Sequence, residues 1–157
     1  MFRELVRFKQ ALSKEECIEI LKATKRGVLC VNGDEGYPYG MPINHYYREC
    51  DGKIYFHGGM QGHKIDALKK DDKVSFCVYS DPIDVENAWY KDFKSVIIFG
   101  RAKPVDHETM LEISRELSYK FTDDEEYIEK ELRTSGPRTL AFAIEIEHIS
   151  GKLVHER

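Results

Sequence analysis

Apolar and polar residues alternate along several short stretches of this chain, and turn-forming residues separate those stretches. In residues 140–148 the large apolar side chains occupy every second position, which is the period of a half-buried strand. Comparable runs predict further strands over residues 28–31, 39–47, 53–57, 73–79 and 93–103. A last hairpin through Ser150 and Gly151 is predicted to end the chain. The pattern therefore predicts about six strands.

Short helical patterns lie between these strands. Ser13 followed by Glu16 predicts a capping box, and the helix behind it is expected to end near Gly27, since glycine suits a helix C-cap. Further helices are predicted over residues 62–70, 107–119 and 124–133. Because only short helices interrupt strands that are joined mostly by hairpins, the sequence predicts a mainly β fold, a small antiparallel barrel in one domain over residues 1–157.

Composition narrows the range of functions. Hydrophobic residues make up 41% of the chain, and a net charge of -4 argues against a general nucleic-acid-binding protein, which would show a basic excess. No apolar run approaches the roughly 20 residues of a membrane-spanning helix. The four cysteines form no CxxC pair, so no metal site is expected, and we infer a reducing, cytoplasmic setting.

Candidate binding chemistry is concentrated in residues 56–68, where a predicted strand passes through three glycines into a predicted helix. Glycines let the backbone approach a ligand closely, and a helix N-terminus offers unpaired N–H groups and partial positive charge. Together these features predict an anion site, most naturally for phosphate, with Lys64 as its cation and His57 and His63 as further donors. The alternative is a glycine-rich turn with a solvated lysine, since neither standard nucleotide fingerprint is present.

Two other places break local rules. Pro42 and Asn44 lie within a predicted strand although neither is a good β former, which indicates either a structural bulge or a ligand-facing groove. Trp89 and Tyr90 lie in a polar loop, where aromatic side chains can anchor an interface, stack on a cofactor or cover the core.

With these elements in place, the chain resembles the FMN-binding split-barrel proteins related to pyridoxamine 5′-phosphate oxidase, and within them the 5-nitroimidazole-resistance (nitroimidazole reductase) branch. Four segments carry the resemblance in order: residues 27–47, 54–68, 74–78 and 89–102. The resemblance implies a six-stranded antiparallel split barrel that forms a homodimer, with FMN at the subunit interface. Near the C-terminus, residues 148–157 lack the full set of basic residues that pyridoxamine phosphate oxidases use for their substrate, so vitamin B6 oxidation is not the expected activity.

The resemblance also implies which residues contact FMN. The isoalloxazine ring would lie along four consecutive residues, Met41, Pro42, Ile43 and Asn44. The ribityl chain and the phosphate would lie beside Phe56, His57 and Gly58, and Lys64 would hold the phosphate. His63 stays a candidate from its position in the loop alone. A third group would come from the partner subunit or would flank the cofactor from the same subunit. It consists of Trp89, Ser95, Val96 and Ile97.

The main functional hypothesis is an FMN-dependent oxidoreductase that takes electrons from NAD(P)H and reduces a small acceptor, for example a nitroaromatic compound. The flavin carries the redox chemistry, so no nucleophilic side chain is needed, and the candidate proton donors for nitro reduction are His57 and a tyrosine such as Tyr46. The alternative is a protein that binds FMN, or haem, without catalysis. Haem would need an axial ligand, for which the chain has six histidines.

Overall fold

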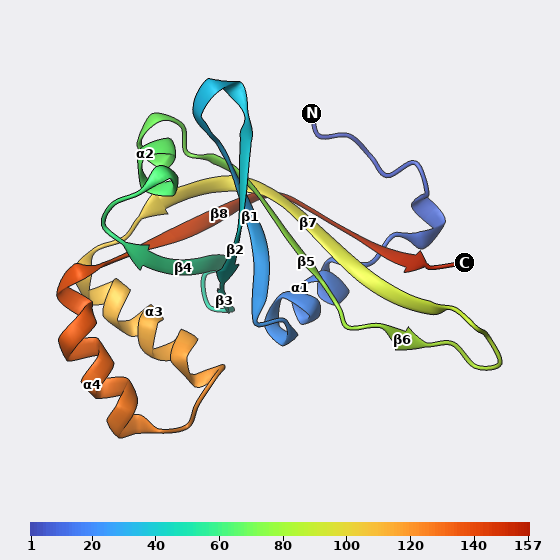
Figure 1. Cartoon of the computed structure of the whole chain (residues 1–157). Helices are drawn as coiled ribbons and strands as arrows, with labels where there is room; N and C mark the ends of the chain where they lie inside the picture. Colours follow the sequence, from blue (N-terminus) through green and yellow to red (C-terminus); the bar gives the residue numbers. More distant parts are fainter.

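The computed structural model describes residues 1–157, and its main feature is one strongly curved antiparallel sheet (Figure 1). Its strands are β1 (Arg26–Asn32), β2 (Pro38–Asn44), β3 (Tyr46–Arg48), β4 (Lys53–Gly59), β5 (Lys73–Tyr79), β6 (Ile83–Asp84), β7 (Lys91–Pro104) and β8 (Thr139–His155). Neighbouring strands follow the order β2-β1-β5-β7-β8-β4-β3, and β6 pairs only with β7. The predicted fold class is confirmed, since the sheet forms a curled half-barrel with short helices, as in a split barrel.

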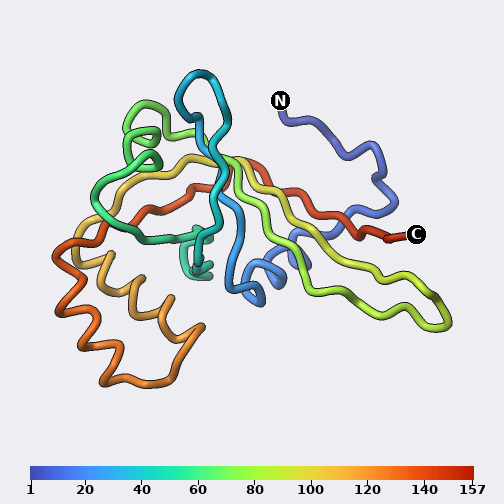
Figure 2. Tube along the Cα trace, in the orientation of Figure 1, coloured from blue at the N-terminus to red at the C-terminus, as the bar shows by residue number.

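Helices cover parts of this sheet and close its connections. The α-helices are α1 (Lys14–Ala23), α2 (His63–Lys70), α3 (His107–Tyr119) and α4 (Glu125–Ser135), and the 3-10 turns are η1 (Phe8–Gln10), η2 (Asp34–Gly36) and η3 (Gly136–Arg138). The capping box of α1 is confirmed: Ser13 Oγ accepts from Glu16 N at 3.1 Å, and Ser13 N donates to Glu16 Oε2 at 2.9 Å. Helices α3 and α4 pack together at one end of the molecule, while the hairpin of β6 and β7 extends at the other (Figures 1 and 2).

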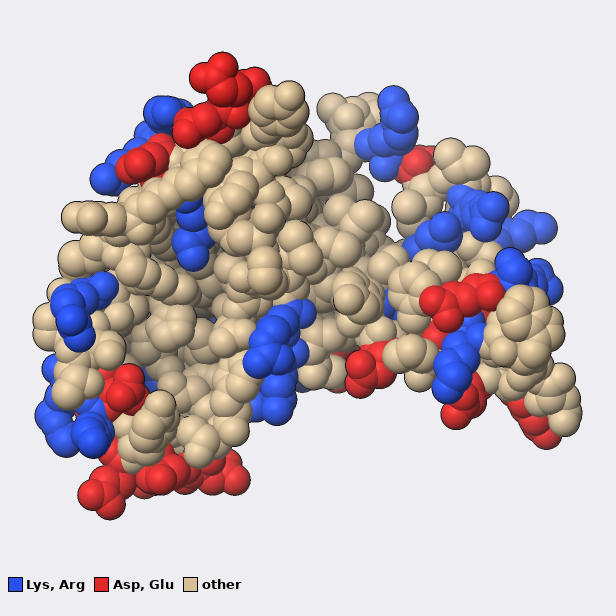
Figure 3. All heavy atoms as spheres, in the orientation of Figure 1, with Lys and Arg blue, Asp and Glu red and all other residues tan.

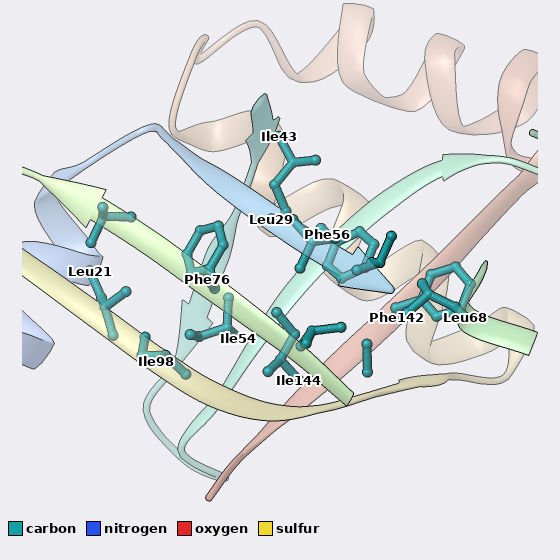
Figure 4. Packing of buried hydrophobic residues seen from close by; sticks show 14 of the residues in the cluster. Leu21, Leu29, Ile43, Ile54, Phe56, Leu68, Phe76, Ile98, Phe142 and Ile144 are labelled. Carbon is teal, nitrogen blue, oxygen red and sulfur yellow. The ribbon is translucent and has the colours of Figure 1, made fainter. Parts of the chain in front are cut away.

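The core lies inside the curve of the sheet. Apolar side chains from β1, β4, β5, β7 and β8 meet there with those of α1 and α2, as Figure 4 shows. Phe56 and Phe142 stack with ring centroids 5.3 Å apart, and both are buried. Burial on this scale is the dominant stabilising contribution to a domain of this size, so the core fixes the positions of β4 and α2.

Four sequence expectations about the strands are corrected. The predicted single strand over 39–47 is interrupted at His45, whose ring is fully buried with Nε2 2.8 Å from the carbonyl oxygen of Leu21, which leaves β2 and β3 as separate strands. Together with the two-residue β6, this raises the count of strands from about six to eight.

No hairpin forms at Ser150 and Gly151, because β8 stays paired with β7 as far as His155. The strand over 140–148 is also not half-buried throughout, since α3 packs on its other face over Ala141 and Ala143.

Gly27 is in β1 and does not cap a helix. Helix α1 ends at Ala23 with Thr24 as its C-cap. A Cβ atom at Gly27 would come 2.4 Å from Cζ of Phe76, and one at Gly151 would come 2.4 Å from Sγ of Cys17. Both glycines therefore serve close packing between a strand and its neighbours and not a change of chain direction.

Several general features concern the whole chain. None of the helices has the length and apolar character that a membrane crossing requires. All four cysteines are free thiols. No three His, Cys, Asp or Glu side chains gather in a way that could hold a metal ion.

Candidate functional site

A cavity of about 350 Å³ lies between β2 and β4, where the curled sheet comes close to closing on itself. These strands stand near opposite ends of the strand order and do not pair with each other. The cavity is lined by residues of four elements, namely Arg26, Pro42, Ile43, Asn44, His57 and Lys64. The structure thus brings together five of the residues that the sequence predicted as a cofactor site.

The charges in this cavity differ from those in a larger one. A cavity of about 690 Å³ lies between β3 and α3. Three of its basic residues, Lys22, Arg48 and Arg115, are each paired with a carboxylate, and the fourth, Lys120, donates to two backbone carbonyl oxygens. In the cavity between β2 and β4, Lys64 and Arg26 are both cationic and neither forms an ion pair. Unpaired cations that share a partly enclosed cavity favour an anionic ligand.

Lys64 occupies the second position of α2, directly after the glycine-rich loop. Its Nζ lies 5.5 Å from the ring centroid of Phe56, and burial alone holds its pKa below the usual range. A Cβ atom at Gly58 would come 3.0 Å from Nζ, so any larger residue there would require the lysine side chain to move from its present position. Gly62, the N-cap of α2, has φ of 128°, a conformation that favours glycine. The loop glycines therefore place both the helix N-terminus and the lysine over the end of β4.

His57 lies one residue before Gly58 and its ring lines the same cavity. Its Nδ1 is 3.1 Å from Oγ of Ser114, a nearly buried residue of α3. Burial and, to a smaller extent, the charge of Lys64 lower the pKa of His57. His57 is therefore held neutral at pH 7 in the absence of a ligand.

Arg26 is the cavity residue that the sequence reasoning missed. It begins β1 and pairs in register with Asn44 of β2, and its Cζ lies 5.5 Å from the ring centroid of Phe121. Counting outward from the predicted turn at Asn32–Gly36 places Arg26 opposite Pro42, whereas the observed register places it opposite Asn44, so the sequence carried only an approximate signal for it.

Other predicted residues lie nearby without lining the cavity. Met41 and Phe56 pack with the core, where Phe56 forms the apolar floor beneath Lys64. His63 turns toward the β1–β2 connection: its Nε2 accepts from the backbone N–H of Asp34 at 3.2 Å, and its ring stacks on Tyr39 at 4.1 Å. The structure therefore places the two loop histidines in different surroundings, with only His57 in the cavity.

The remaining predicted residues lie elsewhere in the chain. Trp89 is 85% exposed in the loop between β6 and β7, at the opposite end of the molecule from α2 (Figures 1 and 2). Ser95, Val96 and Ile97 belong to β7, and Val96 is fully buried in the core. Within one chain these four residues do not meet the cavity.

Comparison with known protein families agrees with this architecture. The model of the family described as pyridoxamine 5′-phosphate oxidase matches residues 13–153. The chain belongs to that family. A search of curated protein sequences found no match.

Solved structures repeat the fold at low sequence identity. A protein of Bacteroides thetaiotaomicron assigned to 5-nitroimidazole antibiotic resistance has a TM-score of 0.77 at 18% identity, covering 92% of this chain and 87% of its own. An FAD-binding protein of Mesorhizobium loti has a TM-score of 0.68 at 24% identity, covering 92% and 97%. The FAD- and haem-binding protein of Mycobacterium smegmatis has a TM-score of 0.72 at 22% identity, covering 92% and 73%. These similarities establish the split-barrel fold.

Proposed function

We propose that this protein binds FMN in the cavity between β2 and β4 and acts as an FMN-dependent oxidoreductase that passes electrons from NAD(P)H to a small acceptor such as a nitroaromatic compound. The observation that carries the proposal is Lys64, a half-buried cation without an acidic partner, over Gly58 at a helix N-terminus. Membership of the family supports a flavin ligand, and so do the FAD-binding proteins among the similar structures.

Each part of the cavity suits one part of the cofactor. Lys64 and the first N–H groups of α2 would hold the phosphate, and Arg26 would add a second positive charge. The strand β2 pairs only with β1, so its other edge leaves backbone donors and acceptors of residues 42–44 free for the polar edge of the flavin ring. When bound, the flavin supplies the redox chemistry, while the protein positions it and tunes its surroundings.

The proposal includes a homodimer with FMN at its interface. Pro42, Val28, Cys77 and Ile97 lie opposite one another in register, in one row on the face of the sheet that is turned away from the core. Val28 is 39% and Ile97 is 43% exposed, as expected for an apolar face that a second copy covers. Because Pro42 also lines the cavity, a second copy on this face would reach the cofactor and could supply Trp89. Light scattering is expected to give the mass of a dimer, and Ile97→Lys to give a monomer.

The first test is the visible absorption spectrum of the purified protein, followed by mass measurement of any released cofactor. We expect a yellow protein that releases FMN. Lys64→Met should weaken FMN binding by about 30- to 100-fold, the usual effect of losing a charged hydrogen bond. Lys69→Met, on the exposed side of the same helix, is the matched control and should leave the affinity unchanged. A colourless protein that takes up no added FMN would overturn the proposal.

A second measurement separates the enzyme from a carrier. Steady-state oxidation of NADH or NADPH with a nitroaromatic acceptor should require bound FMN and should be lost with it. FMN binding with no oxidation of either NADH or NADPH would favour the non-catalytic carrier. Release of haem in place of a flavin would favour the haem-binding alternative.

A further inference from the structure

A short hydrogen-bond chain runs from the cavity into α3. His57 Nδ1 lies 3.1 Å from Ser114 Oγ, and Ser114 Oγ donates to Met110 Sδ at 3.5 Å. Ser114 is 4% and Met110 is 2% exposed, so water does not compete for these contacts. Nε2 of His57 makes no hydrogen bond within the chain and is not sealed away from solvent. It is therefore the ring nitrogen that is available to a ligand in the cavity.

The chain has a preferred direction. A thioether sulfur can only accept, and a hydroxyl group has a single proton, so a Ser114 proton directed at Met110 leaves Oγ to accept from Nδ1–H of His57. Nε2 then carries a lone pair. The opposite tautomer would direct an Nε2–H group into a cavity that already contains the Lys64 ammonium group, which is less favourable. Because Nδ1–H is already in place, protonation of Nε2 requires no rearrangement of Ser114.

Resting on the proposed function, we propose that His57 takes up one proton from solvent at Nε2 when a phosphate group enters the cavity, so that the anion is held between the imidazolium of His57 and the ammonium of Lys64. Without the anion, burial and the charge of Lys64 keep the ring neutral. A phosphate dianion reverses this balance, since it sits beside both cations. Ser114 is a positioning residue in this arrangement, because it accepts Nδ1–H in both states.

The groups that face His57 support this assignment. The charged neighbours in the cavity are Lys64 from α2 and Arg26 from β1, and both are cationic. From α3 the neutral Ser114 contacts His57, with the neutral Met110 behind it, and β8 presents Ala141 opposite His57 in register. Since no carboxylate faces the ring, only an incoming anion can stabilise its protonated form.

Calorimetric titration of the protein with FMN, repeated in buffers of different ionisation enthalpy, tests the proposal directly. At pH 7.0 we expect uptake of about 0.5 to 1 proton per FMN, and an affinity that falls up to about tenfold from pH 7.0 to 8.0, where the phosphate is already dianionic. Riboflavin lacks the phosphate and should bind with no proton uptake. His57→Gln should bind FMN without proton uptake. Because this variant keeps Lys64, any uptake that remained in it would have to come from the lysine.

The role of Ser114 is tested by two substitutions. Ser114→Ala removes the acceptor for Nδ1–H and should reduce the proton uptake, whereas Ser114→Thr keeps a hydroxyl and should restore it. Nitrogen-15 spectra of the histidine side chains should show neutral His57 protonated on Nδ1, changing to the doubly protonated ring on addition of FMN at pH 7.0. These spectra also show whether each variant remains folded.

The outcomes distinguish failure of the proton-uptake proposal from failure of the proposed FMN-binding function. FMN binding with heats that do not depend on the buffer, or a free His57 protonated on Nε2, would overturn proton uptake while leaving the flavin site intact. Failure to bind any flavin would overturn the proposed function. In that case titration with inorganic phosphate, read by the His57 nitrogen signals, still tests the anion site, and unchanged signals would refute it.

Discussion

Two pairs of a histidine and a lysine occupy buried or half-buried sites in this fold, and no member of either pair forms an ion pair with a carboxylate. In the first, His45 Nε2 donates to the carbonyl oxygen of Leu21, and Lys120 Nζ donates to the carbonyl oxygens of Thr24 and His45 at 2.6 and 2.7 Å. In the second, His57 and Lys64 share the cavity between β2 and β4, and Lys64 finds no acceptor. The two pairs contain the same chemical groups but differ in what satisfies them.

The difference shows how a binding site can be distinguished from a structural contact. Burial lowers the pKa of His45 to about 4 and that of Lys120 to about 8, so the first pair is the more strongly perturbed of the two. It is nevertheless structural, because backbone carbonyls use its donors. The second pair is shifted in the same direction and is left open to a ligand. On the proposed function, the pair with an unused donor in a cavity binds the ligand, although the other pair has the larger pKa shifts.

The largest expected contrast comes from removing each histidine. His45→Ala leaves a space beside Phe76, whose ring centroid is 5.0 Å away, and leaves the carbonyl of Leu21 unpaired. Urea denaturation should show a loss of about 3–4 kcal/mol in the free energy of unfolding, with the FMN affinity of the folded protein unchanged. His57→Ala opens onto an existing cavity and should cost about 1 kcal/mol or less. Equal losses in the two variants would contradict the distinction between the pairs.

The second contrast is acid stability. Because the folded protein holds the pKa of His45 at about 4, below the ordinary value of 6.5, the unfolded chain takes up a proton that the folded state excludes. The contribution is fully present above pH 6.5 and is lost as the pH falls toward 4. Denaturation at pH 7.5 and at pH 5.0 should differ by about 2 kcal/mol from this group. His45→Gln should remove that part of the difference, and an unchanged difference would show that other groups dominate.

The third contrast concerns the open pair and its glycine. A methyl group at Gly58 would stand 3.0 Å from Lys64 Nζ, whereas one at Gly59 meets no atom within 4 Å. Gly58→Ala should displace the lysine and weaken FMN binding about five- to tenfold, or about 1 kcal/mol. Gly59→Ala is the matched control and should leave the affinity unchanged. Fluorescence titration with FMN measures both, and equal losses would refute the position given to the lysine.

The smallest expected effect is on stability without ligand. Lys64→Met removes a half-buried cation that has no partner, so the free energy of unfolding should rise by about 0.5 kcal/mol. The same exchange at Lys120 should lower it, because the carbonyls of Thr24 and His45 lose their donor. Thermal unfolding of both variants without flavin measures these opposite signs. A loss of stability in Lys64→Met would mean that Lys64 has a structural role.

Local patterns in the sequence predicted much of this molecule. Alternation and turn residues identify the main strands, and helix α3 has the predicted bounds, His107–Tyr119. The glycine-rich loop with Lys64 was predictable because all its parts are neighbours in sequence, and glycine, helix start and lysine act together over a few residues. The same dependence on local patterns explains the errors at Gly27 and Gly151. They were predicted to end a helix and to form a turn, whereas close packing against Phe76 and Cys17 requires them.

The sequence alone determined the antiparallel β class, the order of the elements and a cation at the start of α2, since these depend on side-chain periodicity and short-range backbone preferences. Only the tertiary structure decided what surrounds that cation. The curl of the sheet brings Arg26 into one cavity with Lys64, and Ser114 reaches His57 from a helix that is 57 residues further along the chain. Such contacts depend on how the whole sheet curves. That curvature results from the packing of the entire core, which cannot be predicted from a local sequence pattern.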